Sequence, residues 1–101
     1  MKFADLINSE TPVLIDFYAD WCQPCKMMPP ILSEVKRTMG DDIKIYKINT
    51  EKNRPLSVKY NIRSIPTLML FKQGKEIWRQ SGVVPANQLI QVLKQQMAAT
   101  V

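Results

Sequence analysis

The sequence contains no histidine, only two cysteines and only three glycines among its 101 residues. Without histidine, neither a Ser–His nor a Cys–His nucleophile pair can form within the chain. Two cysteines are too few for a disulfide-rich secreted scaffold, and without histidine they leave a zinc site short of ligands. Any chemistry must therefore rest on the two thiols or on carboxylates and amines, and we expect no metal.

Long apolar runs are also missing, so the sequence predicts neither a transmembrane helix nor a membrane partner. The first five residues, 1–5, include an acid and lack an apolar core, so we expect no secretory signal and a cytoplasmic location. With 46% apolar residues and a net charge of +5, the composition is typical of a folded domain rather than a disordered tail. We therefore predict a single domain that spans residues 1–101.

The 14 Lys and Arg residues outnumber the 9 Asp and Glu residues, but they are spread along the chain. Nucleic-acid-binding domains usually cluster their basic residues on one element, with aromatic residues between them. That clustering is missing, so we expect a mildly basic, solvated surface and no nucleic-acid partner. Nothing in the sequence indicates an obligate oligomer, and we expect a monomer.

Apolar periodicity predicts an α/β fold in the order helix, strand, helix, strand, helix, strand, strand, helix. We expect helices at 3–8, 22–39, 51–60 and 86–97, and strands at 13–18, 43–48, 67–71 and 76–81. The first strand is apolar apart from Asp16, as in a strand that is covered on both faces. A βαβ unit with a right-handed crossover and then a ββα unit predict a central mixed sheet of about four strands, flanked by helices on both faces.

A Cys-x-x-Cys motif, Cys22-Gln23-Pro24-Cys25, follows the first strand and opens the next helix. Two intervening residues in a helical turn bring the sulfurs within disulfide distance. At a helix start, Cys22 would face unpaired backbone N–H groups, which lower the pKa of a thiol. We expect Cys22 to be the exposed nucleophile and Cys25 the more buried resolving thiol. Pro24 restricts the ring, and Trp21 supplies a flat apolar wall beside it.

Three other interpretations of the motif remain open at this point. The pair could be an inert structural bridge, although so small a ring gains little entropy from the unfolded chain. It could be half of a zinc site that is shared between subunits. Finally, Pro29 and Pro30 could mark the helix start and leave both cysteines in a loop. We favour a redox pair on one helix that is kinked at these prolines.

The chain resembles the thioredoxin family along most of its length. The matching stretches are Asp16-Phe17, Trp21 to Lys26, Pro30, Lys47, Ile65-Pro66-Thr67, Gly74 and Gly82. The resemblance implies the thioredoxin fold and a thiol–disulfide oxidoreductase that reduces client proteins through a reversible Cys22–Cys25 disulfide. It also implies no bound cofactor, and electrons that come from NADPH through a thioredoxin reductase.

Two features depart from the family pattern. Gln23 stands where thioredoxins usually carry glycine, and residues between the cysteines tune the redox potential. The direction of electron flow is therefore open, and an oxidase or isomerase of the same fold is one alternative. A binding module that is independent of redox state is a second, separate alternative. We also expect the usual additional N-terminal strand to be missing, which concerns protection of the sheet edge rather than the site.

Two charged residues are candidates for proton transfer. Burial in an apolar strand should raise the pKa of Asp16, and the resemblance implies that Asp16 accepts the proton of Cys25. The alternative places Asp16 at a water-exposed strand end. Lys47 falls on the same side of its strand as Ile43 and Ile45, so it either reaches inward to Asp16 or extends to solvent.

A second loop supplies the remaining substrate-binding candidates. The frequency of cis X–Pro bonds favours a trans Ile65–Pro66 bond, whereas the resemblance implies a cis bond beside the cysteines. Ile65 could then pair its backbone with an extended client, and Gly82 would allow close approach. The predicted substrate-binding residues are Trp21, Gln23, Pro24, Ile65, Pro66 and Gly82. We expect Tyr18 and Trp78 only to pack.

Overall fold

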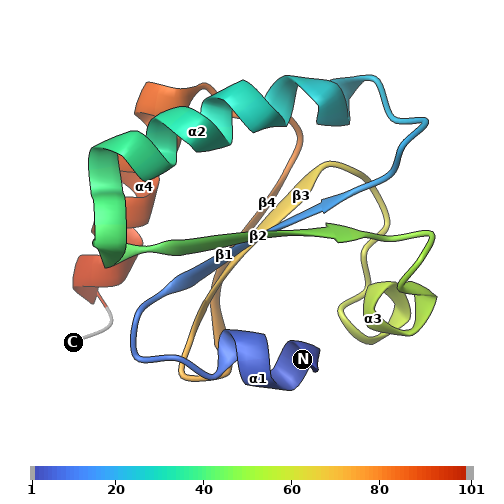
Figure 1. Ribbon diagram of the computed structural model, residues 1–101, viewed down its shortest axis with the longest axis horizontal. Coiled ribbons are helices and arrows are strands. Elements are labelled where there is room, and N and C mark those ends of the chain that lie inside the picture. The colour runs from blue at the N-terminus through green and yellow to red at the C-terminus, as the bar shows by residue number, and fades with distance from the viewer. Residues whose placement is uncertain (1, 100–101) are drawn as a thin grey trace.

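The computed structural model describes residues 2–99 and shows one sheet between two layers of helices (Figure 1). The strands are β1 (Val13–Tyr18), β2 (Lys44–Asn49), β3 (Thr67–Lys72) and β4 (Lys75–Ser81). The helices are α1 (Phe3–Ile7), α2 (Met28–Met39), α3 (Arg54–Lys59) and α4 (Ala86–Ala99), with 3-10 turns η1 (Pro24–Met27) and η2 (Gly40–Asp42). The predicted order of helices and strands is confirmed.

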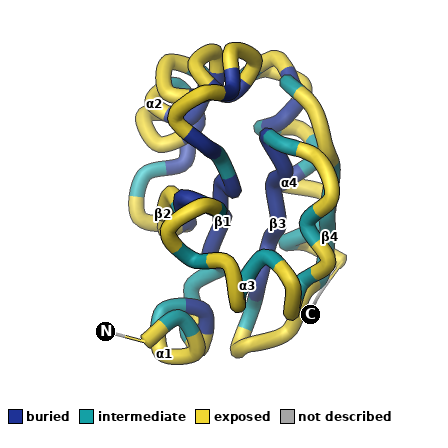
Figure 2. The backbone as a smooth tube through the Cα atoms, turned by 90° about the vertical axis from the view of Figure 1, so that its right-hand side faces the viewer, coloured by how far each residue is buried: buried dark blue, intermediate teal, exposed yellow. Residues whose placement is uncertain are grey.

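The four strands lie in the order β2-β1-β3-β4, so β1 has a neighbour on each side. Strand β2 runs parallel to β1, whereas β3 is antiparallel to both β1 and β4. The predicted mixed sheet, with its βαβ and ββα halves, is therefore confirmed. Figure 2 shows that β1 and β3 carry the longest buried stretches of the sheet.

Each face of the sheet packs against a different pair of helices. On one face, α2 and α4 cover a core that includes Leu14 from β1 and Leu68 from β3. On the other face, α1 and the end of α3 cover Phe17 and Phe71. Successive side chains of a strand point to opposite faces, so Asp16 shares the α2 and α4 face with Leu14.

The segment after β1 differs from the predicted single helix over 22–39. The α-helix begins at Met28, and η1 precedes it as a separate 3-10 turn in which the N–H of Met28 donates to the carbonyl of Cys25. Pro29 and Pro30 have no N–H, and the first turn of an α-helix is where that loss is tolerated. The prediction of one kinked α-helix over 22–39 was therefore wrong, because the α-helix starts next to these prolines. Cys25 still lies in a helical turn, the 3-10 turn η1.

Within residues 2–99, no helix is long and apolar enough to span a membrane. The same residues contain no group of three or more Cys, Asp or Glu side chains placed to hold a metal ion.

Candidate redox site

Cys22 and Cys25 form a disulfide, with their Cα atoms 5.3 Å apart, within the usual range for such bonds. A tight turn after β1 places them, because the N–H of Cys22 donates to the carbonyl of Ala19 at 3.2 Å. The N–H of Cys25 donates to Sγ of Cys22, also at 3.2 Å. A donor aimed at this sulfur favours its thiolate form once the disulfide is reduced.

The predicted difference in exposure between the two cysteines is wrong for the disulfide form. Cys22 is 3% exposed and Cys25 is 5% exposed, so both are buried. Cys22 is covered because its Sγ lies 3.7 Å from the carbonyl oxygen of Ile65, on the neighbouring loop. Cys25 instead borders a cavity of about 190 Å³. The two sulfurs therefore differ in their neighbours rather than in their exposed fraction.

Asp16, on the α2 and α4 face of β1, is fully buried. Neither of its carboxylate oxygens has a hydrogen-bond partner in the part of the chain that the structure describes. Burial raises the pKa of Asp16 to about 6, and the positive charge of Lys47 opposes that rise. The predicted burial is confirmed, and the alternative of a water-exposed strand end is wrong.

Lys47 is directly opposite Asp16 in the parallel register of β1 and β2. The two side chains nevertheless form no ion pair within 4.0 Å, and Lys47 is exposed. Its Nζ lies 4.7 Å from the centroid of the Tyr18 ring instead. The lysine therefore neither contacts the carboxylate nor extends freely into water.

The loop before β3 lies beside the disulfide, and its Ile65–Pro66 bond is cis, as the resemblance implies. The carbonyl of Pro66 accepts the N–H of Gly82 at 2.8 Å, and Oγ1 of Thr67 donates to the carbonyl of Ser64 at 2.6 Å. Gly82 has φ +92°, in the left-handed region, and a Cβ there would meet no atom within 4 Å. Conformation, rather than crowding within the chain, therefore favours glycine at position 82.

A groove separates this loop from Trp21, which is 69% exposed. Its volume is about 170 Å³, and its lining residues are Trp21, Thr50, Ile62, Arg63, Ser64 and Ile65. Gln23 and Pro24 are exposed at the tip of the disulfide ring, and Pro66 is buried beneath the loop. The structure thus gathers the predicted substrate-binding residues around one face, near the carboxyl end of β1.

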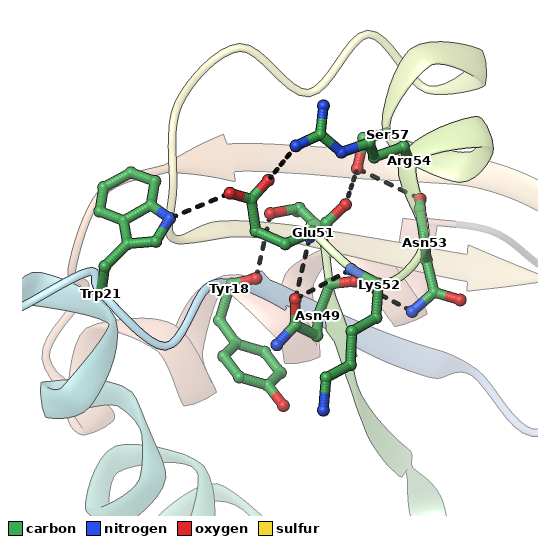
Figure 3. A network of polar contacts seen from close by, with 9 residues as sticks. Tyr18, Trp21, Asn49, Glu51, Lys52, Asn53, Arg54 and Ser57 are labelled. Carbon is green, nitrogen blue, oxygen red and sulfur yellow. Dashed lines mark hydrogen bonds and ion pairs between the residues drawn. The ribbon is translucent and has the colours of Figure 1, made fainter.

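Sequence reasoning missed a polar network that supports Trp21 (Figure 3). The indole Nε1–H of Trp21 donates to Oε1 of Glu51 at 3.3 Å, and the other carboxylate oxygen of Glu51 lies 3.6 Å from Arg54. A signal was present, because Glu51 closely follows β2. The carboxyl ends of parallel strands meet at one edge of a sheet, which places Glu51 near the residues that follow β1.

Comparison with known proteins gives the family. The thioredoxin family profile matches residues 1–95. The chain is 53% identical over 91 residues to thioredoxin Y2, chloroplastic, of Arabidopsis thaliana, which covers 89% of this chain and 54% of that protein. It is 48% identical over 94 residues to a thioredoxin-like protein of Synechocystis, covering 92% and 90%. The chain thus spans about half the length of the plant relatives it matches.

Solved structures agree with this result. The structure of chloroplastic thioredoxin z superposes with a TM-score of 0.80 at 29% identity, covering 88% of this chain and 80% of that one. A malarial thioredoxin-2 superposes with a TM-score of 0.81 at 30% identity, covering 84% and 82%. The sheet order, the Cys22–Cys25 disulfide and these matches together show that the chain belongs to the thioredoxin family.

Proposed function

We propose that this protein reduces disulfides in client proteins, with the Cys22–Cys25 pair cycling between dithiol and disulfide. The observation that carries the proposal is the disulfide at the carboxyl end of β1, the strand that also holds the fully buried Asp16, which has no hydrogen-bond partner among the described residues. The redox group of the family is this disulfide, so no prosthetic group is needed. The plant relatives are about twice as long, so the activity of the whole protein is part of the proposal.

The first step is attack on the client by the reduced pair. The thiolate of Cys22, stabilised by the N–H of Cys25, attacks one sulfur of the client disulfide. A Cys22–client disulfide forms, the client disulfide breaks, and the second client sulfur leaves as a thiolate that takes a proton from water. The client has then gained one free thiol.

The second step releases the client. Cys25 gives its proton to the carboxylate of Asp16, whose raised pKa of about 6 makes it a stronger base than an ordinary aspartate. The Cys25 thiolate attacks Sγ of Cys22, and the remaining client sulfur leaves and takes up a proton. Two electrons have passed from the protein to the client, and the Cys22–Cys25 disulfide has formed.

The groove beside Trp21 is the proposed docking site for the client. Its wall is apolar at Trp21, Ile62 and Ile65. An extended client segment would pair with the backbone of Ile65, which places the client sulfur next to Cys22. The exposed Gln23 and Pro24 would contact the same segment.

The electron source and the setting are also proposals. A thioredoxin reductase would restore the dithiol with electrons from NADPH. The reductase, and not this chain, would bind the NADPH. We propose a monomer that acts in the reducing environment of the cytoplasm, because a dithiol persists at low ambient potential. Several relatives are named chloroplastic, and the plastid is the competing location.

Trapping of the mixed disulfide tests the mechanism. Because Cys25→Ser removes the resolving thiol, the reduced variant should accumulate a disulfide-linked adduct with insulin as the client. Non-reducing electrophoresis would detect this adduct. Cys22→Ser should form no adduct, and it should no longer accelerate the reduction of insulin by dithiothreitol. Val58→Ala, at a site that is 80% exposed, is the matched control and should behave as wild type. An adduct that forms equally well with Cys22→Ser would contradict the assigned roles.

The redox potential of the pair, measured against glutathione, decides between reductase and oxidase. A potential near the cytosolic range, about −270 mV, fits a reductase, whereas a value near −120 mV fits an oxidase. Gln23 makes this measurement informative, because residues inside the ring set the relative stability of dithiol and disulfide. If replacement of both cysteines by serine left the biological role intact, the binding-module alternative would hold instead.

A further inference from the structure

The cavity beside Cys25 has a cationic side chain at its border. The residues that line it are Tyr18, Ala19, Asp20, Cys25, Lys26, Pro29 and Lys47. Strand β2 contributes Lys47, and β1 contributes Tyr18 at its last position. The cavity thus borders both the resolving cysteine and the Lys47 amine, so the position of that amine is relevant to proton transfer at Cys25.

The backbone of Tyr18 is held firmly at this point. Its carbonyl accepts two hydrogen bonds from Thr50, one from the backbone N–H at 2.8 Å and one from Oγ1–H at 3.2 Å. Figure 3 shows Tyr18 within this network, with its ring directed away from Glu51 and Arg54. Because the carbonyl is fixed and the side chain is half-buried, the ring has a defined place beside the cavity.

Among the described residues, the Tyr18 ring is the direct contact of the Lys47 ammonium group, which acts on Asp16 only at longer range. Nζ lies 4.7 Å from the ring centroid, and no carboxylate lies within 4.0 Å of it. An ammonium over an aromatic face is attracted by the ring quadrupole. A free, exposed lysine would otherwise move its head group into water and away from the buried Asp16.

We propose that Tyr18 is a positioning residue that holds the ammonium of Lys47 at the border of the Cys25 cavity. Held there, the positive charge stabilises negative charge on both Asp16 and the Cys25 thiolate, the two groups between which a proton moves. This inference rests on the proposed function for its meaning, but the position of the lysine can be tested without any client.

Other charges also face Lys47. Asp16 and the exposed Asp20 lie on or just after β1, and they attract the ammonium. Lys26 from η1 and Lys36 from α2 share its surroundings and repel it. Lys36 is itself held by the carbonyls of Gly40 and Ile43, at 2.8 and 2.7 Å, so it cannot move far. The ring therefore acts among opposing charges, and its loss should release the lysine.

The pKa of Asp16 reports where the Lys47 ammonium lies, so titration of Asp16 tests the proposal. The carboxyl carbon of Asp16 would be followed by NMR in the disulfide form of wild type, Tyr18→Leu, Tyr18→Phe, Lys47→Met and the Tyr18→Leu/Lys47→Met double variant. Tyr18→Leu and Lys47→Met should each raise the titration midpoint of Asp16 above the wild-type value. For Tyr18→Leu we expect a rise of roughly half a pH unit. The double variant should match Lys47→Met, and Tyr18→Phe should match wild type because it keeps the ring.

Three results would overturn the proposal: an unchanged midpoint in Tyr18→Leu, a lowered one, or shifts that add fully in the double variant. Tyr46→Leu removes a partly exposed tyrosine of β2 and is the matched control, with no shift expected. If Tyr18→Leu does not fold, wild type still decides, because a ring 4.7 Å away should move the Lys47 ε-methylene protons upfield. Ordinary ε-methylene shifts would refute the contact, whereas client trapping by Cys25→Ser would stand or fall separately.

Discussion

The two faces of β1 are equally buried but hold different kinds of side chain. Ile15 and Phe17 point into an apolar cluster with α1, in which Phe3 and Phe71 meet edge to face with ring centroids 5.8 Å apart. One residue away, Asp16 points to the opposite face as an unpartnered carboxylate. Both Asp16 and Phe17 have no exposed surface.

Because successive side chains of β1 point to opposite faces of the sheet, one strand can serve stability on one face and chemistry on the other. The α1 face contributes to stability, since apolar burial is favourable there and, among the residues described, it holds no buried side-chain oxygen or nitrogen without a hydrogen-bond partner. The α2 face gives up stability at one position, because a buried carboxylate without a hydrogen-bond partner is unfavourable, and under the proposed function it gains the base that takes the proton of Cys25. The following predictions test whether stability and chemistry really separate in this way.

The largest expected effect is on the apolar face. Because Phe17→Ala leaves a cavity in a packed cluster, it should lower the free energy of unfolding by about 3–5 kcal/mol, measured by urea denaturation. Trapping of insulin by the Cys25→Ser form should persist in the folded fraction. A Phe17→Ala protein that stays stable but loses trapping would break the comparison, since chemistry would then depend on the apolar face.

The next effect is on the chemical face and depends on pH. Because the pKa of Asp16 is raised from 3.8 to about 6, native protein holds a proton in this range that the unfolded chain has released. Stability should therefore fall as pH rises from about 4 to 6, by roughly 3 kcal/mol in total, and then level off. Asp16→Asn should remove this loss, becoming more stable than wild type at pH 8 while releasing clients more slowly.

Urea denaturation at pH 4.5 and pH 8 checks the sign. Wild type should be less stable at pH 8 than Asp16→Asn, and the two should differ little at pH 4.5. The opposite result would be a wild-type protein that becomes more stable from pH 4.5 to pH 8 when Asp16→Asn does not. It would mean that the carboxylate has a partner in solution, and the comparison between the two faces would no longer hold.

The smallest effect concerns Gly82, which lies beyond the end of β4. Gly82→Ala should cost about 1–2 kcal/mol of stability, because its φ of +92° is strained for a residue with Cβ. The new methyl group meets nothing within the chain. Insulin trapping that falls further than stability would show that the client occupies this space, and trapping that follows stability alone would show that it does not.

Much of the fold could be predicted from sequence because its signals are local. The apolar run at 13–18 gave β1 with its observed bounds, Val13–Tyr18. The buried environment of Asp16 followed from the same run. The Cys-x-x-Cys spacing likewise predicted the disulfide, since two residues in a helical turn leave few other arrangements for the sulfurs.

The remaining features depend on contacts between distant segments. The burial of Cys22 depends on the loop that carries Ile65, 43 residues further along the chain. The place of the Lys47 ammonium depends on a ring from another strand, and periodicity only indicates the side of β2 on which the lysine starts. The cis bond at Pro66 was implied by resemblance alone, because the frequency of cis bonds favours the trans form.

The bonds around the Ile65 loop have a consequence for recognition. Pro66 is tied to Gly82, and Thr67 is tied to the carbonyl of Ser64 and contacts the hydroxyl of Ser81 at 2.9 Å. A surface fastened in this way loses little conformational entropy when a guest peptide settles on it. Under the proposed function, a rigid loop of this kind would present the same backbone groups to every client, so recognition would depend little on the side chains of the client.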